Sequence, residues 1–159
     1  MEKFLDINDK QNILEMLQRL DVNAVPLFGK MSAQHMVEHI CGGVLFSNGK
    51  LPQKLYYPAD KAAIMKNILI YSDEGFPKDF KAPMLGNDLP RLVFPELQTA
   101  ISRLSIQLDN FHTYFETYKD AKPIHPVMGE LSYQEWIIFH NKHFTHHFKQ
   151  FGLIEQLEL

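Results

Sequence analysis

From residue 136 to residue 151 the chain runs without a proline or a glycine, and this stretch holds four of the eight histidines. Aromatic residues recur in it at three- and four-residue spacing, so the pattern predicts a single helix that ends at Gly152. At about 100° and 1.5 Å per residue, His143 and His147 lie about 40° apart and about 6 Å along the helix axis. Two imidazole rings placed in this way can both turn toward one metal ion.

The same projection assigns the faces of this helix. The residues on or beside the His143/His147 stripe are Trp136, His140 and Gln150. The adjoining apolar face consists of Tyr133, Ile137, Phe144, Phe148 and Phe151, and the residues away from both faces are Lys142, Thr145 and Lys149. The paired histidines therefore border the side that we expect to be buried, whereas His146 points to the flank and is the weaker candidate. A histidine in such a place is more often a hydrogen-bonded boundary residue than a ligand, so a third ligand from elsewhere in the chain is needed to hold an ion firmly.

Length and composition indicate one domain that spans residues 1–159. A hydrophobic content of 45% supports a packed core, and a net charge of -3 without a long run of one sign argues against nucleic-acid binding. The first residues lack a signal-peptide pattern and no segment has the length of a membrane span, so we expect a soluble cytoplasmic protein without membrane contact. The single cysteine, Cys41, excludes an internal disulfide and a cysteine-rich zinc site, and we expect it to be a buried small residue.

Four further helices are predicted from capping residues and apolar periodicity. They span residues 9–20, 32–47, 60–71 and 95–118, with Ser32 as the cap of the second, Ala62, Ala63, Ile64, Met65, Ile68 and Leu69 as the apolar positions of the third, and Pro95 in the first turn of the fourth. Ser132 is the expected cap of the histidine-rich helix. Residues 72–94 are longer than an ordinary connection, so they form a covering loop with a function or contain a short element that the pattern does not show. Since no segment alternates convincingly with period two, the predicted fold is all-α, a bundle of four main helices with one shorter helix and a long connecting loop.

The predicted helix over residues 32–47 carries two histidines four residues apart, His35 and His39, with Glu38 beside them. If this helix faces the 136–151 helix across a bundle, it supplies the missing ligand of a three-histidine site with open positions. Gly42 and Gly43 lie in the same helix and cost roughly 1 kcal/mol each relative to alanine, so we expect another helix or a ligand to pack closely against them. His112, by contrast, lies beside an apolar stripe of the 95–118 helix and is interpreted as structural.

Parts of the chain resemble a known family. Met31-Ser32-Ala33-Gln34-His35-Met36-Val37-Glu38-His39-Ile40 is similar to the first histidine-bearing helix of the DinB/YfiT-like metal-binding bundles. Three later stretches resemble the C-terminal signature of one uncharacterised DinB-like subfamily. They are His125-Pro126-Val127-Met128-Gly129-Glu130-Leu131-Ser132, then Glu135-Trp136, then His143-Phe144-Thr145-His146-His147-Phe148-Lys149-Gln150-Phe151-Gly152. The resemblance covers roughly residues 28–153, and its specific part is the H-x-x-H-H-x-x-Q-F-G ending.

The resemblance implies a DinB-like bundle with a metal site formed by His39, His143 and His147. It places His35 one helical turn before the family's ligand position, as an additional ligand or a supporting residue. It places Gln150 after the last ligand, where the amide could orient a histidine or a substrate. It also implies a divalent ion, zinc or nickel first and manganese or iron next, and a homodimer.

The leading functional hypothesis is a metal-dependent enzyme that acts on a small-molecule substrate such as a low-molecular-weight thiol, as a thiol S-transferase-like or hydrolase-like protein. A dication held by three neutral ligands lowers the pKa of a bound thiol or water toward neutrality. His35, His140 and Gln150 are the candidate catalytic residues, and His125 and Glu38 are further candidates for proton transfer or substrate positioning. Two alternatives stay open: a metal-binding or sensing protein without turnover, and a bundle whose histidines only satisfy one another.

Overall fold

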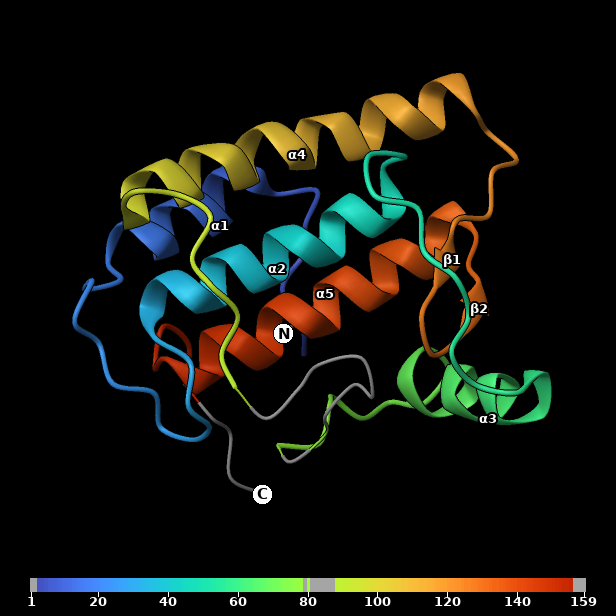
Figure 1. Ribbon diagram of the computed structural model, residues 1–159, viewed down its shortest axis with the longest axis horizontal. Helices are drawn as coiled ribbons and strands as arrows, with labels where there is room; N and C mark the ends of the chain where they lie inside the picture. The colour runs from blue at the N-terminus through green and yellow to red at the C-terminus, as the bar shows by residue number, and fades with distance from the viewer. Residues whose placement is uncertain (1–2, 79, 81–87, 156–159) are drawn as a thin grey trace.

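A computed structural model describes residues 3–78, 80 and 88–155 (Figure 1). These residues form helices α1 (Lys10–Gln18), α2 (Ala33–Ser47), α3 (Ala59–Leu69), α4 (Leu97–Thr117) and α5 (Tyr133–Gln150), and a hairpin of strands β1 (Ile124–His125) and β2 (Gly129–Glu130). Helix α2 lies between α4 and α5, α1 packs on α4, and α3 lies beside the hairpin (Figure 1). The predicted all-α class with four main helices and a shorter one is confirmed, and the core fills the space between α2, α4 and α5.

The helix boundaries follow the predicted capping residues. The Ser32 side chain accepts a hydrogen bond from the backbone of His35, and Ser132 forms a complete capping box with Glu135. Gly152 ends α5 with a φ of 69°, a left-handed conformation that glycine adopts without steric cost. The start of α4 differs, because Glu96 is its N-cap and Pro95 precedes it instead of lying in the first turn, and α1 and α3 each end two residues earlier than predicted.

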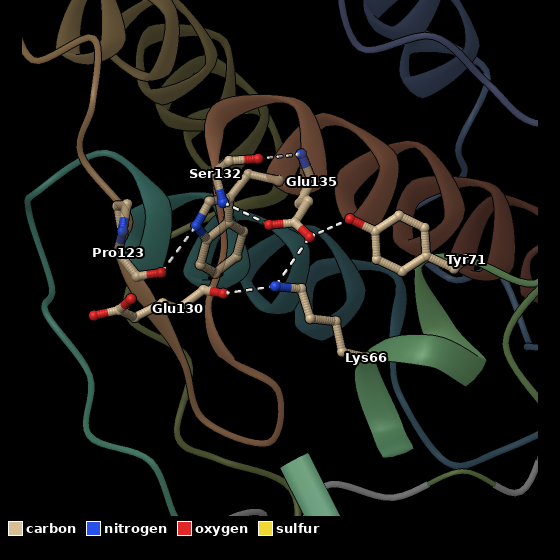
Figure 2. A network of polar contacts seen from close by, with 7 residues as sticks. Lys66, Tyr71, Pro123, Glu130, Ser132 and Glu135 are labelled. Carbon is tan, nitrogen blue, oxygen red and sulfur yellow. Dashed lines mark hydrogen bonds and ion pairs between the residues drawn. The ribbon is translucent and has the colours of Figure 1, made fainter. Parts of the chain in front are cut away.

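The hairpin is the element that the sequence pattern did not predict. Its strands pair antiparallel, Ile124 with Glu130 and His125 with Gly129. Two residues per strand are too few to show a period-two alternation, so no pattern could reveal them. The segment that leads from α4 into this hairpin has a structural role, because the backbone carbonyl of Pro123 accepts a hydrogen bond from the indole of Trp136 at 3.1 Å (Figure 2).

Polar contacts join α3 and the residues just after it to the first turn of α5. Figure 2 shows the Glu135 carboxylate between the Tyr71 hydroxyl, which donates to it, and the Lys66 ammonium, 2.9 Å away. Burial raises the pKa of Glu135, but the hydrogen bonds from Ser132, Tyr71 and Lys66 outweigh it and hold that pKa at about 2. The predicted apolar face of α3 is wrong in part, since only Ala62 and Leu69 of the helix are buried. The side chains of two predicted members of that face, Ile64 and Ile68, are half exposed.

The side of α5 that lies away from the histidine stripe and the apolar face is covered as well. The N-terminal segment crosses it, so that the backbone N–H of Leu5 donates to Thr145 Oγ1 and that of Ile7 to Asn141 Oδ1, both at 2.8 Å. Lys142 is buried and donates to the carbonyl of Ser72. Lys142 and Thr145 lie away from both predicted faces and are nevertheless buried, because their polar atoms satisfy the backbone that passes over the helix.

In the part of the chain that the structure describes, no helix combines the length and the apolar character that a membrane crossing requires.

Candidate metal centre

Three histidines from two helices converge between α2 and α5. His39 comes from α2, and His143 and His147 from successive turns of α5. One ring nitrogen of each lies within 4.8 Å of the other two, and the Nε2 atoms of His39 and His143 are 3.0 Å apart. The ring centroids are 4.7 to 4.9 Å apart and the rings meet edge to face. The fold thus places His39, the predicted third residue, beside the predicted pair of His143 and His147.

Burial keeps these imidazoles neutral. His143 and His147 are 7% and 6% exposed, whereas His39 is partly open to solvent. Desolvation, and then the nearby His146, lower the pKa of His39 to about 4. Desolvation followed by the other rings of the cluster lowers the pKa of His143 and His147 well below the ordinary value. Neutral imidazole is the form that binds a metal ion, so burial keeps the cluster in its metal-binding protonation state at neutral pH.

Gln150 sets the orientation of His147. Its Nε2 donates to the Phe28 carbonyl at 3.0 Å, and its Oε1 lies 2.7 Å from His147 Nδ1. Because a carbonyl can only accept, the amide orientation is fixed, and His147 Nδ1 must carry the proton that Oε1 accepts. The Nε2 lone pair of His147 is therefore free. We call this pair of hydrogen bonds the Gln150 latch, and it is the kind of support that metal-binding histidines usually have.

The latch also holds the connection between α1 and α2 against the end of α5. The backbone N–H of Leu27 donates to the Gln150 carbonyl at 2.7 Å. Gly29 has a φ of +79°, and a Cβ added there would lie 2.7 Å from the Gln150 amide nitrogen. Glycine is required at this position both by its backbone conformation and by the close approach of the amide.

His143 is held by packing and by the contact of its Nε2 atom with that of His39. A Cβ on Gly43 would lie 3.3 Å from two atoms of the His143 ring, and the Phe139 ring centroid is 5.0 Å from that of His143. Among the described residues, none forms a hydrogen bond with the buried Nδ1 of His143. The expectation that a neighbouring helix packs closely against the Gly42-Gly43 pair is confirmed for Gly43, whereas Gly42 has no atom within 4 Å of its Cβ position.

The arrangement fits a divalent ion. Bonds of about 2.0–2.1 Å from zinc to nitrogen allow two ligand atoms 3.0 Å apart to share one ion. The widest separation in the cluster, up to 4.8 Å, would close by ring movements on the order of 1 Å. The donor set of three neutral imidazoles suits zinc, nickel, manganese and iron alike, so the geometry supports a site without fixing the metal.

Two further histidines lie beside the cluster but bond elsewhere. His140 is fully buried under Trp136, and its Nε2 lies 2.8 Å from Ser47 Oγ. Since that hydroxyl donates to the Val44 carbonyl, it must accept from His140, which places the proton of His140 on Nε2. The second, His125, accepts from the backbone N–H of Val127 through Nδ1 and lies against Trp136. Burial is the main cause that lowers the pKa of both rings to about 3.

His35 and Glu38 hold the C-terminal end of the 72–94 loop. His35 Nε2 lies 2.9 Å from the Pro90 carbonyl and its Nδ1 lies 2.6 Å from Ser32 Oγ. The Glu38 carboxylate accepts from the backbone N–H groups of Val93 and Phe94. Neither His35 nor Glu38 contributes an atom to the three-histidine cluster. The structure therefore supports the covering-loop interpretation for the described ends of this segment, and residues 79 and 81–87 lie outside the described part.

Three other sequence interpretations can be compared with the structure. His146 lies at the flank, as predicted, with its ring near those of Phe28 and Phe76. The structural role of His112 is supported, because its Nδ1 lies 2.9 Å from the Tyr133 hydroxyl. Cys41 is buried, and burial is the main cause that raises the pKa of its thiol to about 11, so it is a poor nucleophile.

Fold and site together define a helical-bundle protein with a buried three-histidine cluster that could hold a metal ion. The chain belongs to the DUF1569 family, described as a protein of unknown function, whose model matches residues 1–152. No curated protein and no solved structure was found to match the chain. The match covers the cluster and the Gln150 latch, whereas the narrower likeness to the DinB/YfiT-like bundles stays a prediction from the motifs.

Proposed function

We propose that this protein is a metal-dependent enzyme in which His39, His143 and His147 hold a divalent ion, zinc or nickel before manganese or iron. One observation carries the proposal. Three neutral imidazoles from two helices converge, and the Gln150 side-chain amide directs the Nε2 lone pair of His147 by accepting from its Nδ1. A cluster of buried histidines that merely satisfied one another would not need a dedicated acceptor on the outer nitrogen of His147.

The ion, when bound, would favour the deprotonated form of a thiol or of water at neutral pH. The chain's own thiol does not compete for this role, because Cys41 lies on the opposite face of α2 and stays protonated. A small-molecule thiol or water would instead approach from the side of His39, the most exposed ring of the three. Gly42, three residues further along α2, has no atom within 4 Å of a Cβ placed on it, so the helix surface at that position is open. The proposed reactions are therefore transfer from a low-molecular-weight thiol, or hydrolysis.

A second function, metal binding or sensing without turnover, is favoured by a different observation. His35, His140 and His125 each form a hydrogen bond that holds the fold, to Pro90, Ser47 and Val127 respectively. Gln150 is also engaged at both ends of its amide. The candidate catalytic residues are thus committed to structural contacts, and any proton acceptor would have to come from the substrate or from the ion's own ligands.

The test is elemental analysis of the full chain, purified without an affinity tag or chelator, for wild type, His39→Ala and His143→Ala. His112→Ala is the matched control, since it removes a half-buried imidazole outside the cluster. We expect one ion per chain in wild type and in the control, and loss of the ion from both cluster variants. No ion in wild type after reconstitution with zinc or nickel would refute the site.

Turnover then separates the two functions. The loaded protein is assayed with thiols and electrophilic acceptors, and with ester and amide substrates, against the His143→Ala variant. Activity that follows the metal content supports the enzyme. A fully loaded protein that is inert while its conformation or partner binding changes with the metal supports the sensor. The homodimer implied by the resemblance stays a prediction, which sedimentation equilibrium would check.

A further inference from the structure

A cavity of about 380 Å³ lies between α2 and α4, away from the histidine cluster. Its α2 wall includes Cys41, which is two residues from both His39 and Gly43. At about 100° per residue, that separation places Cys41 on the opposite face of α2 from the side that meets α5. The cavity is thus distinct from the metal centre, and a ligand could bind in it whether or not the proposed function is correct.

The charged side chains that line this cavity are all cations. It contains two cations, Lys50 at the exit of α2 and Arg103 on α4, and no carboxylate. Within the described ranges, neither cationic head has a hydrogen bond or an ion pair with another side chain. Among the described residues, Glu38 is the acid that influences Cys41, but it does not line the cavity and its carboxylate accepts from backbone N–H groups. The lining itself therefore carries two positive charges and no negative charge.

A chain of amides presents further hydrogen-bond donors to the same space. The backbone N–H of Lys50 donates to Asn48 Oδ1 at 3.1 Å, which fixes the orientation of that amide, since a backbone N–H can only donate. Asn48 Nδ2 then donates to Gln107 Oε1 at 2.9 Å, and Asn110 Nδ2 donates to the same oxygen at 3.3 Å. The orientation of the Gln107 side-chain amide is therefore fixed as well, with its Oε1 toward Asn48 and Asn110.

This order leaves the amino group of Gln107 without an acceptor. Gln107 is only 7% exposed and lines the cavity, and among the described residues none accepts from its Nε2. Among the described residues, the buried side-chain atoms without a partner are both on histidines, so the Gln107 amino group reaches the open side of the cavity, where water or a ligand can accept from it. Two oriented N–H groups next to two free cations are what an oxyanion would bind through charge-assisted hydrogen bonds.

We propose that the α2/α4 cavity is a binding site for a small organic carboxylate, whose oxygens accept from the Arg103 guanidinium and the Gln107 amide. Lys50 adds a second positive charge at the rim. The apolar part of the ligand would lie against Leu45, Phe94 and Ile106, which complete the lining. A volume of about 380 Å³ is in the lower range of small-molecule sites, so the ligand has a short aliphatic or a single aromatic body.

The test is a titration of the full-length protein with benzoate, followed through the side-chain amide signals of Gln107 and the guanidinium signal of Arg103 by nuclear magnetic resonance. Benzamide, which has the same shape without the charge, is the matched control ligand. We expect saturable shifts of both signals with benzoate, at a dissociation constant in the millimolar range or tighter, and none with benzamide.

Two variants test the assigned residues. Arg103→Gln removes one exposed cation and should weaken benzoate binding about ten-fold. Gln107→Glu keeps an acceptor for Asn48 and Asn110 but places a negative charge in the cavity, and should abolish binding. Lys119→Gln is the control, since Lys119 lines a separate cavity beside His112 and Glu116.

Several results would overturn the proposal. They are equal binding of benzamide, shifts confined to the histidine rings of the metal centre, or an Arg103→Gln variant that binds benzoate as wild type does. The Arg103→Gln result decides even if Gln107→Glu fails to fold, because Arg103 is a surface residue without structural partners among the described side chains.

Discussion

Replacing Gln150 by leucine removes the Gln150 latch while keeping the side-chain volume nearly unchanged. The buried Nδ1–H of His147 and the half-buried Phe28 carbonyl then lose their partner. Each unsatisfied group costs about 1–3 kcal/mol, so we expect the metal-free protein to lose about 2–6 kcal/mol of unfolding free energy, toward the lower end because the Phe28 carbonyl is only half-buried. Loss of the supporting acceptor also releases the His147 tautomer, and changes of this kind typically lower metal affinity about 10–100-fold.

Gln150→Glu separates the two effects of the latch. A carboxylate can still accept from His147 Nδ1 but cannot donate to the Phe28 carbonyl, so stability should fall while metal affinity is kept. Urea unfolding of chelator-treated protein gives the stability, and competition with a chromogenic chelator gives the zinc affinity. If the leucine variant binds zinc within about three-fold of wild type, the orienting role assigned to Gln150 is wrong, because the weakest effect expected is ten-fold.

Further predictions concern the glycines and the buried histidines. Gly29→Ala should lower the unfolding free energy by about 2 kcal/mol or more in urea, since it combines a positive φ with a 2.7 Å approach to the latch; a change under about 0.5 kcal/mol would contradict this. Gly42→Ala, which meets no atom within 4 Å, should raise it by about 0.5–1 kcal/mol, whereas Gly43→Ala presses on the cluster and should lower both stability and zinc affinity. The folded-state pKa of about 3 for His125 and His140 lies below the ordinary 6.5, so the unfolded state takes up protons first as the pH falls. Stability should therefore be full above pH 6.5 and decline toward pH 3, by about 2 kcal/mol per histidine at pH 5. Equal urea midpoints of chelator-treated protein at pH 7 and pH 5 would show that these rings are not buried as neutral groups.

Much of the candidate site could be predicted because it depends on short-range spacing. His143 and His147 are four residues apart on one helix, so their proximity follows from helix geometry. That His39 would meet them required only that two amphipathic helices pack face to face, which the bundle fold provides. The caps Ser32 and Ser132 could also be identified, because each acts within three residues of itself.

What could not be predicted depends on contacts between distant segments. Lys142 and Thr145 look like surface residues in a helical projection, but the N-terminal segment and the segment at Ser72 cover them. His35 and His39 have the same spacing as the paired ligands, and nothing local indicates that His35 turns to the Pro90 carbonyl instead. The role of Gly43 against the His143 ring likewise depends on how closely α2 and α5 approach.

Helix α3 is attached to the rest of the molecule differently from the other helices. Only Ala62 and Leu69 of this helix are buried, and Lys66 and the following Tyr71 also bond to Glu135 at the start of α5. Such a unit opens before the global unfolding of a protein. Backbone amides of α3 should therefore exchange with deuterium through a local opening, faster than those of α2 or α5. Added salt should speed that exchange selectively, because it screens the Lys66–Glu135 pair and leaves the apolar core unaffected.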